Sequence, residues 1–580
     1  MTNSDLYVYN AQPSRPEAAK GADPVTTEIV RHSLNMAANQ MKRSLVRTAF
    51  SSVIYEVLDF AAAIYDRDIR MLAQCQTLPM FMGTMNFCIE GAIAENGGIE
   101  NFEPGDVILY NDPFGIGSHQ QDASIVMPIF KDDEIVGYAT AKAHLPDVGG
   151  KEPYCTDTVD VFQEGTIYPA VKIYKAGKLN EELHRLFLAN SRFPRYTAGD
   201  LEALVVCVKA GAKELIKIID RFGKQTFDQC AERMFDHGEI VVRKYLENIP
   251  DGKYVGKGMI DNNGIDDEPI PFEVSVEVTG SDITVDYSNA PPVTGGPLNC
   301  PIATTVSATR MALTYLANGG DMASEGHFRP LKVISKPNTL FHAEKPAPTF
   351  LFFVPAMRAM EAIWEAVSTA MPDNVTAGSD GDIEGAVWWG THRDSGEDWV
   401  EGFPHPGGQG ASAHGDGLSA MMHPMQAATR NTPAEVFETR APWLLKKYEL
   451  AQDSCGAGTY RSGLGCDIAY HMLDDSYVTV FIEQQKSEPW TVESGRPGRS
   501  NRGALIMPDG TEKSVTKHTG MLVPKGHTLE IRTGGGGGYG PAEERSVAAV
   551  LDDLRNGYIS VEHVKKHYPH ALDSDVQSAA

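Results

Sequence analysis

Residues 110–150 read YNDPFGIGSHQQDASIVMPIFKDDEIVGYATAKAHLPDVGG, and the predicted architecture starts from them. This stretch holds two apolar runs, and the charged sequence Lys131-Asp132-Asp133 between them predicts a hairpin loop. Two strands joined by such a loop are antiparallel, so the start of the first lies beside the end of the second. The pairing therefore predicts that His119, Asp122 and His144 converge at one edge of a sheet.

Two imidazoles and a carboxylate at one point are typical ligands of a divalent transition metal. Taken singly, the patterns are weak. A histidine near a strand end is more often a hydrogen-bonding residue, and the glycine-rich approach at 114–117 is also consistent with a plain turn. The second histidine, followed by Pro146-Asp147 and two glycines, favours the metal site.

Two further carboxylates are candidates for the site. Asp59 stands between Leu58 and Phe60 in a segment that reads as a strand, and a buried carboxylate must be paired, neutralised or bound to a cation. It is either a fourth contributor to the metal site or a solvent-facing residue at a strand end. Glu164, next to Gly165, is a candidate substrate-side carboxylate, with surface placement as the simpler alternative.

Composition excludes some classes of function. The chain has 580 residues, 42% of them hydrophobic, and a net charge of -26. So acidic a chain is a poor match for nucleic acid or an anionic membrane, both of which require basic surface. The chain also has no apolar run of transmembrane length. Residues 1–24 lack the pattern of a secretory signal and read as a flexible leader.

The eight cysteines form no CxxC pair, which favours reduced thiols in a cytoplasmic protein. Cys455 is the one candidate nucleophile, because it lies in a glycine-rich turn. His405 and His414 also lie in glycine-rich loops, where binding a ligand and capping the backbone are equally good explanations.

The predicted fold class is α+β, a large multi-layer mixed fold with antiparallel sheets, a helical middle section and a β-rich C-terminal part. Residues 25–50 predict an amphipathic helix with Thr26 or Thr27 as its cap and Ile29, Leu34, Met36, Met41, Leu45 and Val46 on one face. We expect a metal-site α+β domain over 25–250. A β-rich α+β domain with glycine-rich loops over 251–580 is expected to pack closely on it.

Residues 534–538 are five successive glycines. Such a run lets the backbone approach another segment closely or adopt positive φ. The chain has no GxxxxGK[ST] and no GxGxxG placed between a strand and a helix, so no nucleotide site is predicted.

The chain resembles the B subunits of the hydantoinase/5-oxoprolinase family, which also includes a subunit of acetone and acetophenone carboxylases. The matching segments run nearly end to end and in order: VRTAFSS, LDFAAAIYD, YNDPFGIGSHQQD, AHLPDVGG, FQEGTIYPAVKIY, ANSRFPRYTAGDLEA, TGGPLNC, PGGQGASAHGDG, NTPAEVFETRAPWLLKKYELAQDSCGAGTYRSGLG and GGGGGYGPAEERSVAAVLDDLRNGYIS.

The resemblance implies a division of labour between two kinds of chain. ATP is bound by an A subunit, which phosphorylates the substrate, and the B subunit holds one divalent metal, with zinc, manganese and iron all open. It implies an (AB)2 heterotetramer, and metal ligands at Asp59, His119, Asp122 and His144. Asp147 is then a candidate for supporting the site or accepting a proton, with capping of the turn before Gly149 as the alternative.

Three functions stay open at this point. The first is an ATP-dependent hydrolase of cyclic amides such as hydantoins, lactams or 5-oxoproline. The second is an ATP-dependent ketone carboxylase, and the third is a scaffold whose metal is structural. The chain departs from the family at Phe81, where a histidine is common, and at Gln120-Gln121, where Leu-Pro is common. These departures leave the substrate open.

Overall fold

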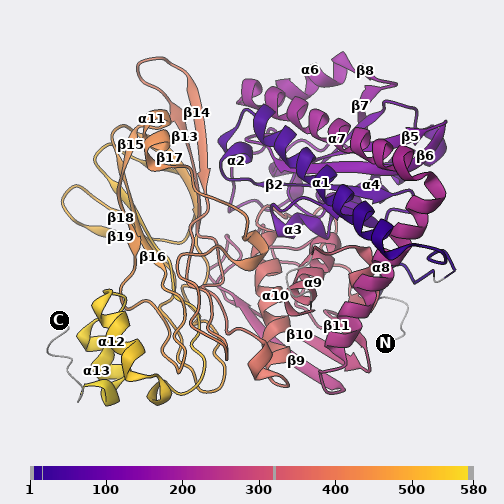
Figure 1. The fold of residues 1–580 in the computed structure, drawn as a ribbon. Helices are drawn as coiled ribbons and strands as arrows, with labels where there is room; N and C mark the ends of the chain where they lie inside the picture. Colours follow the sequence, from indigo (N-terminus) through magenta and orange to yellow (C-terminus); the bar gives the residue numbers. More distant parts are fainter. Residues whose placement is uncertain (1–5, 16, 318–321, 573–580) are drawn as a thin grey trace.

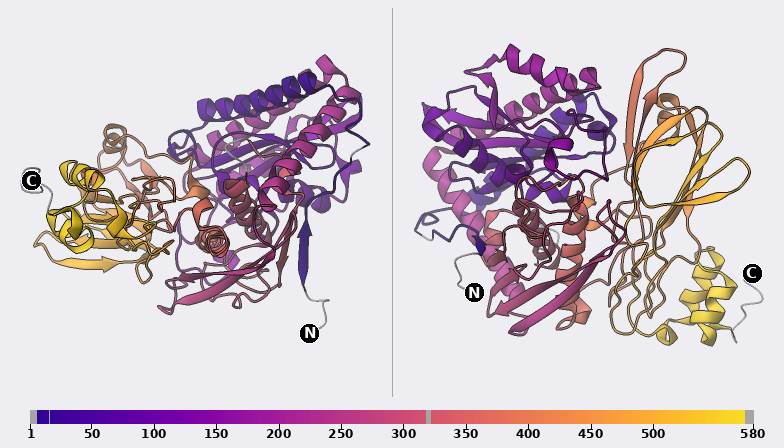
Figure 2. Two further views of the ribbon diagram at one scale, coloured as in Figure 1. Left: turned by 60° about the horizontal axis from the view of Figure 1, so that its bottom comes forward. Right: turned by 180° about the vertical axis from the view of Figure 1, so that it is seen from behind.

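The structure is a computed structural model that describes residues 6–15, 17–317 and 322–572. Two sheets with helices between and outside them form one half of the molecule, and a β-rich unit lies beside them (Figure 1). Both views of Figure 2 show the same side-by-side arrangement, with the C-terminal helices at the far corner. The predicted α+β class with antiparallel sheets is confirmed.

The first sheet has seven strands in the order β3-β2-β6-β5-β4-β7-β8, and neighbouring strands are antiparallel. Its strands are β2 (Phe60–Asp66), β3 (Met71–Gln74), β4 (Val107–Tyr110), β5 (Asp122–Lys131), β6 (Glu134–His144), β7 (Val171–Lys175) and β8 (Lys178–Leu179). β5 and β6 form the predicted hairpin. Asp132 and Asp133 have φ of 50° and 64°, the left-handed pair that a tight type I′ turn requires.

Helices cover both faces of this sheet. One face packs on α1 (Pro24–Thr48), α7 (Pro194–Phe222) and α8 (Lys224–Leu246). The other packs on α4 (Met85–Glu95), α9 (Ile302–Ala317) and α10 (Phe353–Ser368). Short helices connect the elements: α2 (Ser52–Tyr55), α3 (Pro79–Met82), α5 (Pro113–Ile116) and α6 (Glu181–Ala189).

The structure corrects two details of the first helix. The cap of α1 is Asp23, whose carboxylate accepts a hydrogen bond from the Thr26 amide at 2.7 Å. Its buried face holds Leu34, Met41 and Leu45, as expected. Ile29 and Met36 are instead 40% and 58% exposed, because the buried face of the helix is rotated from the predicted one. Val30 is buried in the first turns where Ile29 was expected.

A second sheet lies on the far side of α9 and α10, in the order β1-β12-β11-β10-β9. Its strands are β1 (Tyr7–Asn10), β9 (Gly252–Ile260), β10 (Ile270–Thr279), β11 (Asp282–Asp286) and β12 (Leu331–Ser335). β1 belongs to the segment that the sequence predicts to be a flexible leader. It pairs antiparallel with β12 because its alternating Tyr-Val-Tyr favours a strand.

The C-terminal unit contains a four-stranded and a five-stranded sheet around a core of its own. The first comprises β13 (Gly385–Thr391), β14 (Asp398–Phe403), β17 (Ser476–Phe481) and β20 (Lys517–Val523). The second comprises β15 (Trp443–Leu450), β16 (Cys466–Met472), β18 (Arg502–Ile506), β19 (Glu512–Val515) and β21 (Thr528–Arg532). The remaining helices are α11 (Ala434–Arg440), α12 (Val547–Arg555) and α13 (Val561–His567).

The five-glycine run packs backbone against backbone inside this unit. The Gly537 amide donates to the Gly378 carbonyl at 2.8 Å, and the Ala411 amide donates to the Gly537 carbonyl at 2.9 Å. A Cβ on Gly537 would lie 2.0 Å from the carbonyl oxygen of Trp490. The glycines therefore permit the close approach that the sequence predicts.

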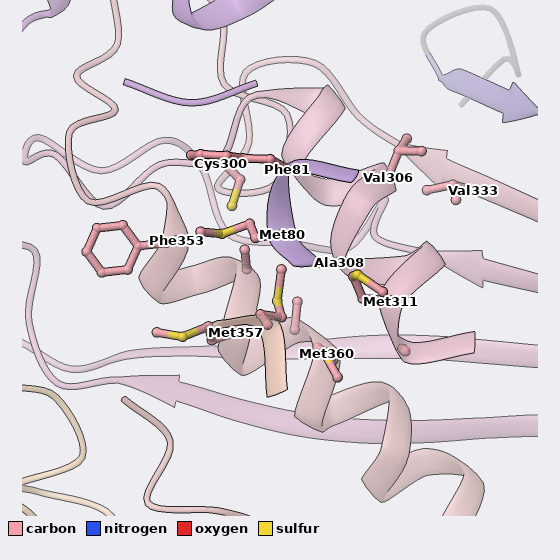
Figure 3. Close-up of a cluster of buried hydrophobic side chains, with 14 of the residues drawn as sticks. Met80, Phe81, Cys300, Val306, Ala308, Met311, Val333, Phe353, Met357 and Met360 are labelled. Atoms are coloured by element: carbon pink, nitrogen blue, oxygen red, sulfur yellow. The ribbon is translucent and has the colours of Figure 1, made fainter. Parts of the chain in front are cut away.

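One continuous hydrophobic core joins the first sheet, α9, α10 and the second sheet. Figure 3 shows part of it, with Met80 and Phe81 from α3 beside Met357 and Phe353 from α10. This packing brings α3 and α10 to the edge of the first sheet where the hairpin ends. None of the helices in the described residues is long and apolar enough to cross a membrane.

Candidate metal centre

The hairpin register brings two of the predicted ligands together. Asp122, the first residue of β5, pairs directly with His144, the last residue of β6. His119 lies three residues upstream, after α5 and the left-handed Gly117 (φ 71°). A Cβ on Gly117 would lie 2.7 Å from the Ala303 Cβ, so glycine lets this loop pack against α9.

Three ligand-type atoms form a nearly equilateral triangle. His119 Nε2 lies 3.1 Å from Asp122 Oδ1 and 3.0 Å from His144 Nδ1, and His144 Nδ1 lies 3.1 Å from Asp122 Oδ1. Across the described part of the chain, this is the one group of three or more His, Cys, Asp or Glu side chains whose ligand atoms converge in this way. All three residues are buried.

The tautomer of His119 follows from its other nitrogen. Nδ1 lies 2.8 Å from the Phe350 carbonyl oxygen, which can only accept, so Nδ1 carries the hydrogen. In the neutral ring, Nε2 then presents a lone pair to Asp122 and His144. A backbone carbonyl that fixes a ring in this way is a common support for a metal-binding histidine.

The triangle fits a divalent transition metal. Lone pairs about 3 Å apart repel one another unless a proton or a cation lies between them. Ligands at right angles around an ion about 2.1 Å away lie about 3.0 Å apart, which is the edge of this triangle. Oδ2 of Asp122 is also buried with no hydrogen-bond partner. Burial alone would raise the pKa of Asp122, but the two histidines hold it below its usual range.

Asp59 lies beside the triangle but is not one of its vertices. Its carbonyl accepts the His144 amide at 3.1 Å, which brings its side chain to the same cavity. Its Oδ1 is buried without a hydrogen-bond partner, and burial raises its pKa to about 7. The preceding Leu58 has φ of 65°, a left-handed conformation that is strained for a leucine. The role of Asp59 as a fourth ligand stays a prediction.

Glu164 does not contact the triangle itself but is connected to it through Phe350. Its Oε1 accepts hydrogen bonds from the amides of Thr349 and Phe350, at 2.8 and 2.9 Å, and from Thr158 Oγ1 at 2.8 Å. Burial raises its pKa to about 8, and these hydrogen bonds only partly offset the effect. Glu164 thus holds the residue whose carbonyl orients His119.

Asp147 has other partners. Its Oδ1 accepts from the Gly149 amide at 3.1 Å and lies 2.8 Å from a guanidinium nitrogen of Arg192. This is the turn-capping geometry, reinforced by an ion pair. Neither Asp147 nor Glu164 is among the residues that line the cavity at the triangle. Their catalytic roles stay predictions.

The loop candidates lie elsewhere. His405 is fully buried and contacts the Glu384 carbonyl and the Tyr470 hydroxyl, and burial lowers its pKa to about 4. His414 is exposed. Cys455 is buried, and burial raises the pKa of its thiol to about 12, so it is not poised as a nucleophile.

A cavity with a volume of about 90 Å³ opens beside the triangle. Its walls come from the first sheet, the short helices α2 and α3, the start of α10, strands β13, β14 and β17 of the C-terminal unit, and residues 426–429. Sequence reasoning missed the lining residues Phe352 and Tyr154, and it missed Phe350, whose carbonyl orients His119. The aromatic run Thr349–Phe353 between two prolines was the available signal.

Fold and site together define a large α+β protein with a buried His-Asp-His group at the foot of an apolar cavity. The chain belongs to the hydantoinase B/oxoprolinase family, whose model matches residues 23–542.

Two similar proteins align over nearly the whole chain. The B subunit of a putative D-/L-hydantoinase from Pseudomonas sp. (strain NS671) is 30% identical over 570 residues, covering 95% of each chain. The crystal structure of ATP-dependent caprolactamase from Pseudomonas jessenii matches with a TM-score of 0.88 and 28% identity, covering 96% of this chain and 98% of that one. A nucleotide-free acetone carboxylase structure matches with a TM-score of 0.84 at 17% identity, covering 94% and 79%, and this likeness concerns the fold.

Proposed function

We propose that this chain is the metal-containing B subunit of an ATP-dependent cyclic-amide hydrolase. The observation that carries the proposal is the buried triangle of His119, Asp122 and His144 at the foot of a cavity. A putative hydantoinase and a caprolactamase are among the similar proteins, which supports the hydrolase. ATP would be used by a partner A subunit, in an (AB)2 assembly.

His119, Asp122 and His144, with Asp59 beside them, would hold one divalent zinc, manganese or iron ion. A bound ion of this kind supplies a Lewis acid for a substrate oxygen and lowers the pKa of water. The chain's own residues do the rest. The Phe350 carbonyl orients His119, and Glu164 holds Phe350 in place. The apolar walls exclude bulk water from the reacting carbon.

The proposed net reaction converts a cyclic amide, ATP and two waters into an amino acid, ADP and phosphate. The partner transfers a phosphoryl group to the amide oxygen and releases ADP. Water adds to the same carbon, and the C–N bond breaks with its electron pair and a proton passing to nitrogen. A second water then releases phosphate from the acyl phosphate, which leaves the carboxylate.

A ketone carboxylase is the second candidate, because the fold also matches an acetone carboxylase. One assay separates the two. The complex of this chain with its ATP-using partner is supplied with ATP, and is given lactams in one arm and ketones with labelled bicarbonate in the other. The hydrolase releases an amino acid, and the carboxylase puts label into an acid product. Label without lactam opening would overturn the hydrolase.

A test of the structural-metal alternative uses His119→Ala. Full activity of a folded variant with its partner would contradict a catalytic role for the site. Thermal melting of the same preparation shows whether the variant is folded.

A further inference from the structure

The cavity beside the metal triangle is walled by hydrocarbon. Its aromatic lining residues are Phe81, Phe352, Phe353, Phe403, Phe481 and Tyr154. Gln426 and Thr429 are the neutral polar residues among the rest, and the described residues that line it include no lysine or arginine. A negatively charged substituent on a substrate would therefore meet no lysine or arginine on these walls.

Two cations behind the walls have partners of their own. Lys142 lies behind Phe81, with its ammonium 4.9 Å from the ring centre, and donates to Thr84 Oγ1 and the Ile116 carbonyl. A guanidinium nitrogen of Arg440 lies 3.6 Å from the carboxylate of Glu401. Glu401 stands in the chain between the lining residues Val400 and Gly402. Neither Lys142 nor Arg440 is among the residues that line the cavity.

Behind another wall lie buried carboxyl groups, together with the buried Lys517, which is paired with Glu483. Ile383 lines the cavity, and its neighbours Asp382 and Glu384 are fully buried. Placing an unpaired carboxylate in such surroundings forfeits its hydration without replacing it by an ion pair. The walls thus penalise an anion and accept a hydrocarbon.

The walls are also fixed in place by contacts between rings. Tyr154 stacks on Phe481 with ring centres 5.4 Å apart, and Phe353 lies 5.2 Å from the same ring. Tyr154 in turn lies 5.9 Å from the His119 ring, which ties the wall to the triangle. At about 90 Å³ the cavity is smaller than the engineered apolar cavity of about 150 Å³ that binds benzene, so it has room for at most one small ring.

We propose that this cavity selects an electrically neutral substrate, whose ring or chain is hydrocarbon apart from the reacting amide or carbonyl, and excludes carboxylate-bearing analogues. The proposal rests on the proposed function and adds the substrate class to it. The polar end of the substrate meets the triangle, and its hydrocarbon part lies between Phe81, Phe353 and Phe481.

The test compares three lactams that share one five-membered ring. The complex with the ATP-using partner, supplied with ATP, is assayed with 2-pyrrolidinone, with 5-oxoproline, which adds one carboxylate, and with 5-oxoprolinamide, which is neutral and of equal bulk. We expect kcat/KM for 5-oxoproline to be at least about 100-fold below that for the amide, because an anion is left unpaired. Equal values for acid and amide would overturn the proposal.

A matched pair of variants locates the selection in the cavity. Thr429 is half-buried in the lining, so a longer side chain can be accommodated there. Thr429→Lys supplies a cation, and Thr429→Gln is a neutral control of polar character. We expect Thr429→Lys to raise the acid-to-amide ratio of kcat/KM at least about 10-fold, and Thr429→Gln to leave it unchanged. An unchanged acid-to-amide ratio in both variants would contradict the inference that the substrate lies in this cavity.

A failure of the proposed hydrolase function can be distinguished from a failure of the inferred selection for neutral substrates. If the complex carboxylates ketones instead, 2-pentanone and 4-oxopentanoate give the same comparison of neutral and anionic substrates. If it turns over neither class, saturation-transfer NMR of the complex with the three lactams decides. Binding of the neutral lactams that is lost in Val387→Trp, which fills the cavity, supports the inference. Equal binding of 5-oxoproline overturns it.

Discussion

Two clusters of buried polar side chains respond to burial in opposite ways. In the first, His119, Asp122 and His144 bring their ligand atoms within 3.1 Å of one another at a cavity. The second contains Asp380, Asp382 and Glu384, all fully or almost fully buried. Both contain carboxylate oxygens with no hydrogen-bond partner, so burial by itself does not distinguish them.

The difference lies in what neighbours each carboxylate. Imidazoles hold the pKa of Asp122 below its usual range, which keeps it an anion that is ready for a cation. Burial and a neighbouring acid raise the pKa of Asp382 to about 7, and burial and neighbouring acids raise the pKa values of Asp380 and Glu384 well above their usual range. Packing also closes the second cluster, since a Cβ on Gly407 would lie 2.0 Å from Asp380 Oδ2. The first cluster has the geometry of a metal site, and in the second burial favours the protonated form of the carboxyl groups.

The largest effect is expected from His119→Ala. Loss of a ligand should lower metal affinity by more than the roughly 10- to 100-fold that loss of an orienting partner costs. Metal content per chain, measured by elemental analysis after gel filtration, checks this. Glu384→Gln is the control from the second cluster and should keep its metal. Equal metal in His119→Ala and the wild type would contradict the distinction between the clusters.

Asp382→Asn tests the second cluster through pH. A carboxyl group whose pKa is raised by folding stabilises the protein fully below its unfolded pKa, near 4, and this stability is lost as pH rises through about 7. We expect the wild type to lose about 4 kcal/mol relative to Asp382→Asn between pH 4 and pH 8. Denaturant unfolding at several pH values measures it. Parallel stability curves for the two proteins would show that Asp382 is not held neutral.

Gly537→Ala tests the close packing of the glycine run. Its new methyl group would meet the Trp490 carbonyl at 2.0 Å, so we expect a loss of about 2 kcal/mol in the free energy of unfolding. Gly295→Ala is the matched control, because a Cβ there meets nothing within 4 Å. A melting temperature unchanged from the control would argue against backbone packing as the reason for the run.

The smallest effect is expected from Glu164→Ala. Losing the hydrogen bonds to the Thr349 and Phe350 amides should loosen the carbonyl that orients His119, and lower metal affinity about 10-fold. Glu164→Gln retains an acceptor oxygen and should restore most of the affinity, as measured by competition with a chelator. If both variants bind metal as the wild type does, Glu164 has no positioning role.

The sequence predicted the triangle because its three residues belong to one hairpin. A tight turn and antiparallel pairing bring the two strand ends together, and a one-residue register shift near Ile129 and Phe130 places Asp122 opposite His144. His119 is only three residues away from Asp122. The cavity was not predictable in the same way. The carbonyl that orients His119 lies 231 residues downstream, and Phe481 comes from a different sheet. Such contacts depend on how layers stack, which local periodicity does not encode. The predicted buried face of α1 was wrong at Ile29 and Met36 for a similar reason. The neighbouring helices decide which side chains of α1 are covered.

The most direct test of the metal centre is anomalous diffraction from crystals of the complex, recorded on both sides of the absorption edges of zinc, manganese and iron. We predict one strong anomalous peak about 2.1 Å from His119 Nε2, His144 Nδ1 and an oxygen of Asp122. A crystal whose anomalous peak lies elsewhere, with these three side chains hydrogen-bonded only to one another, would contradict the account.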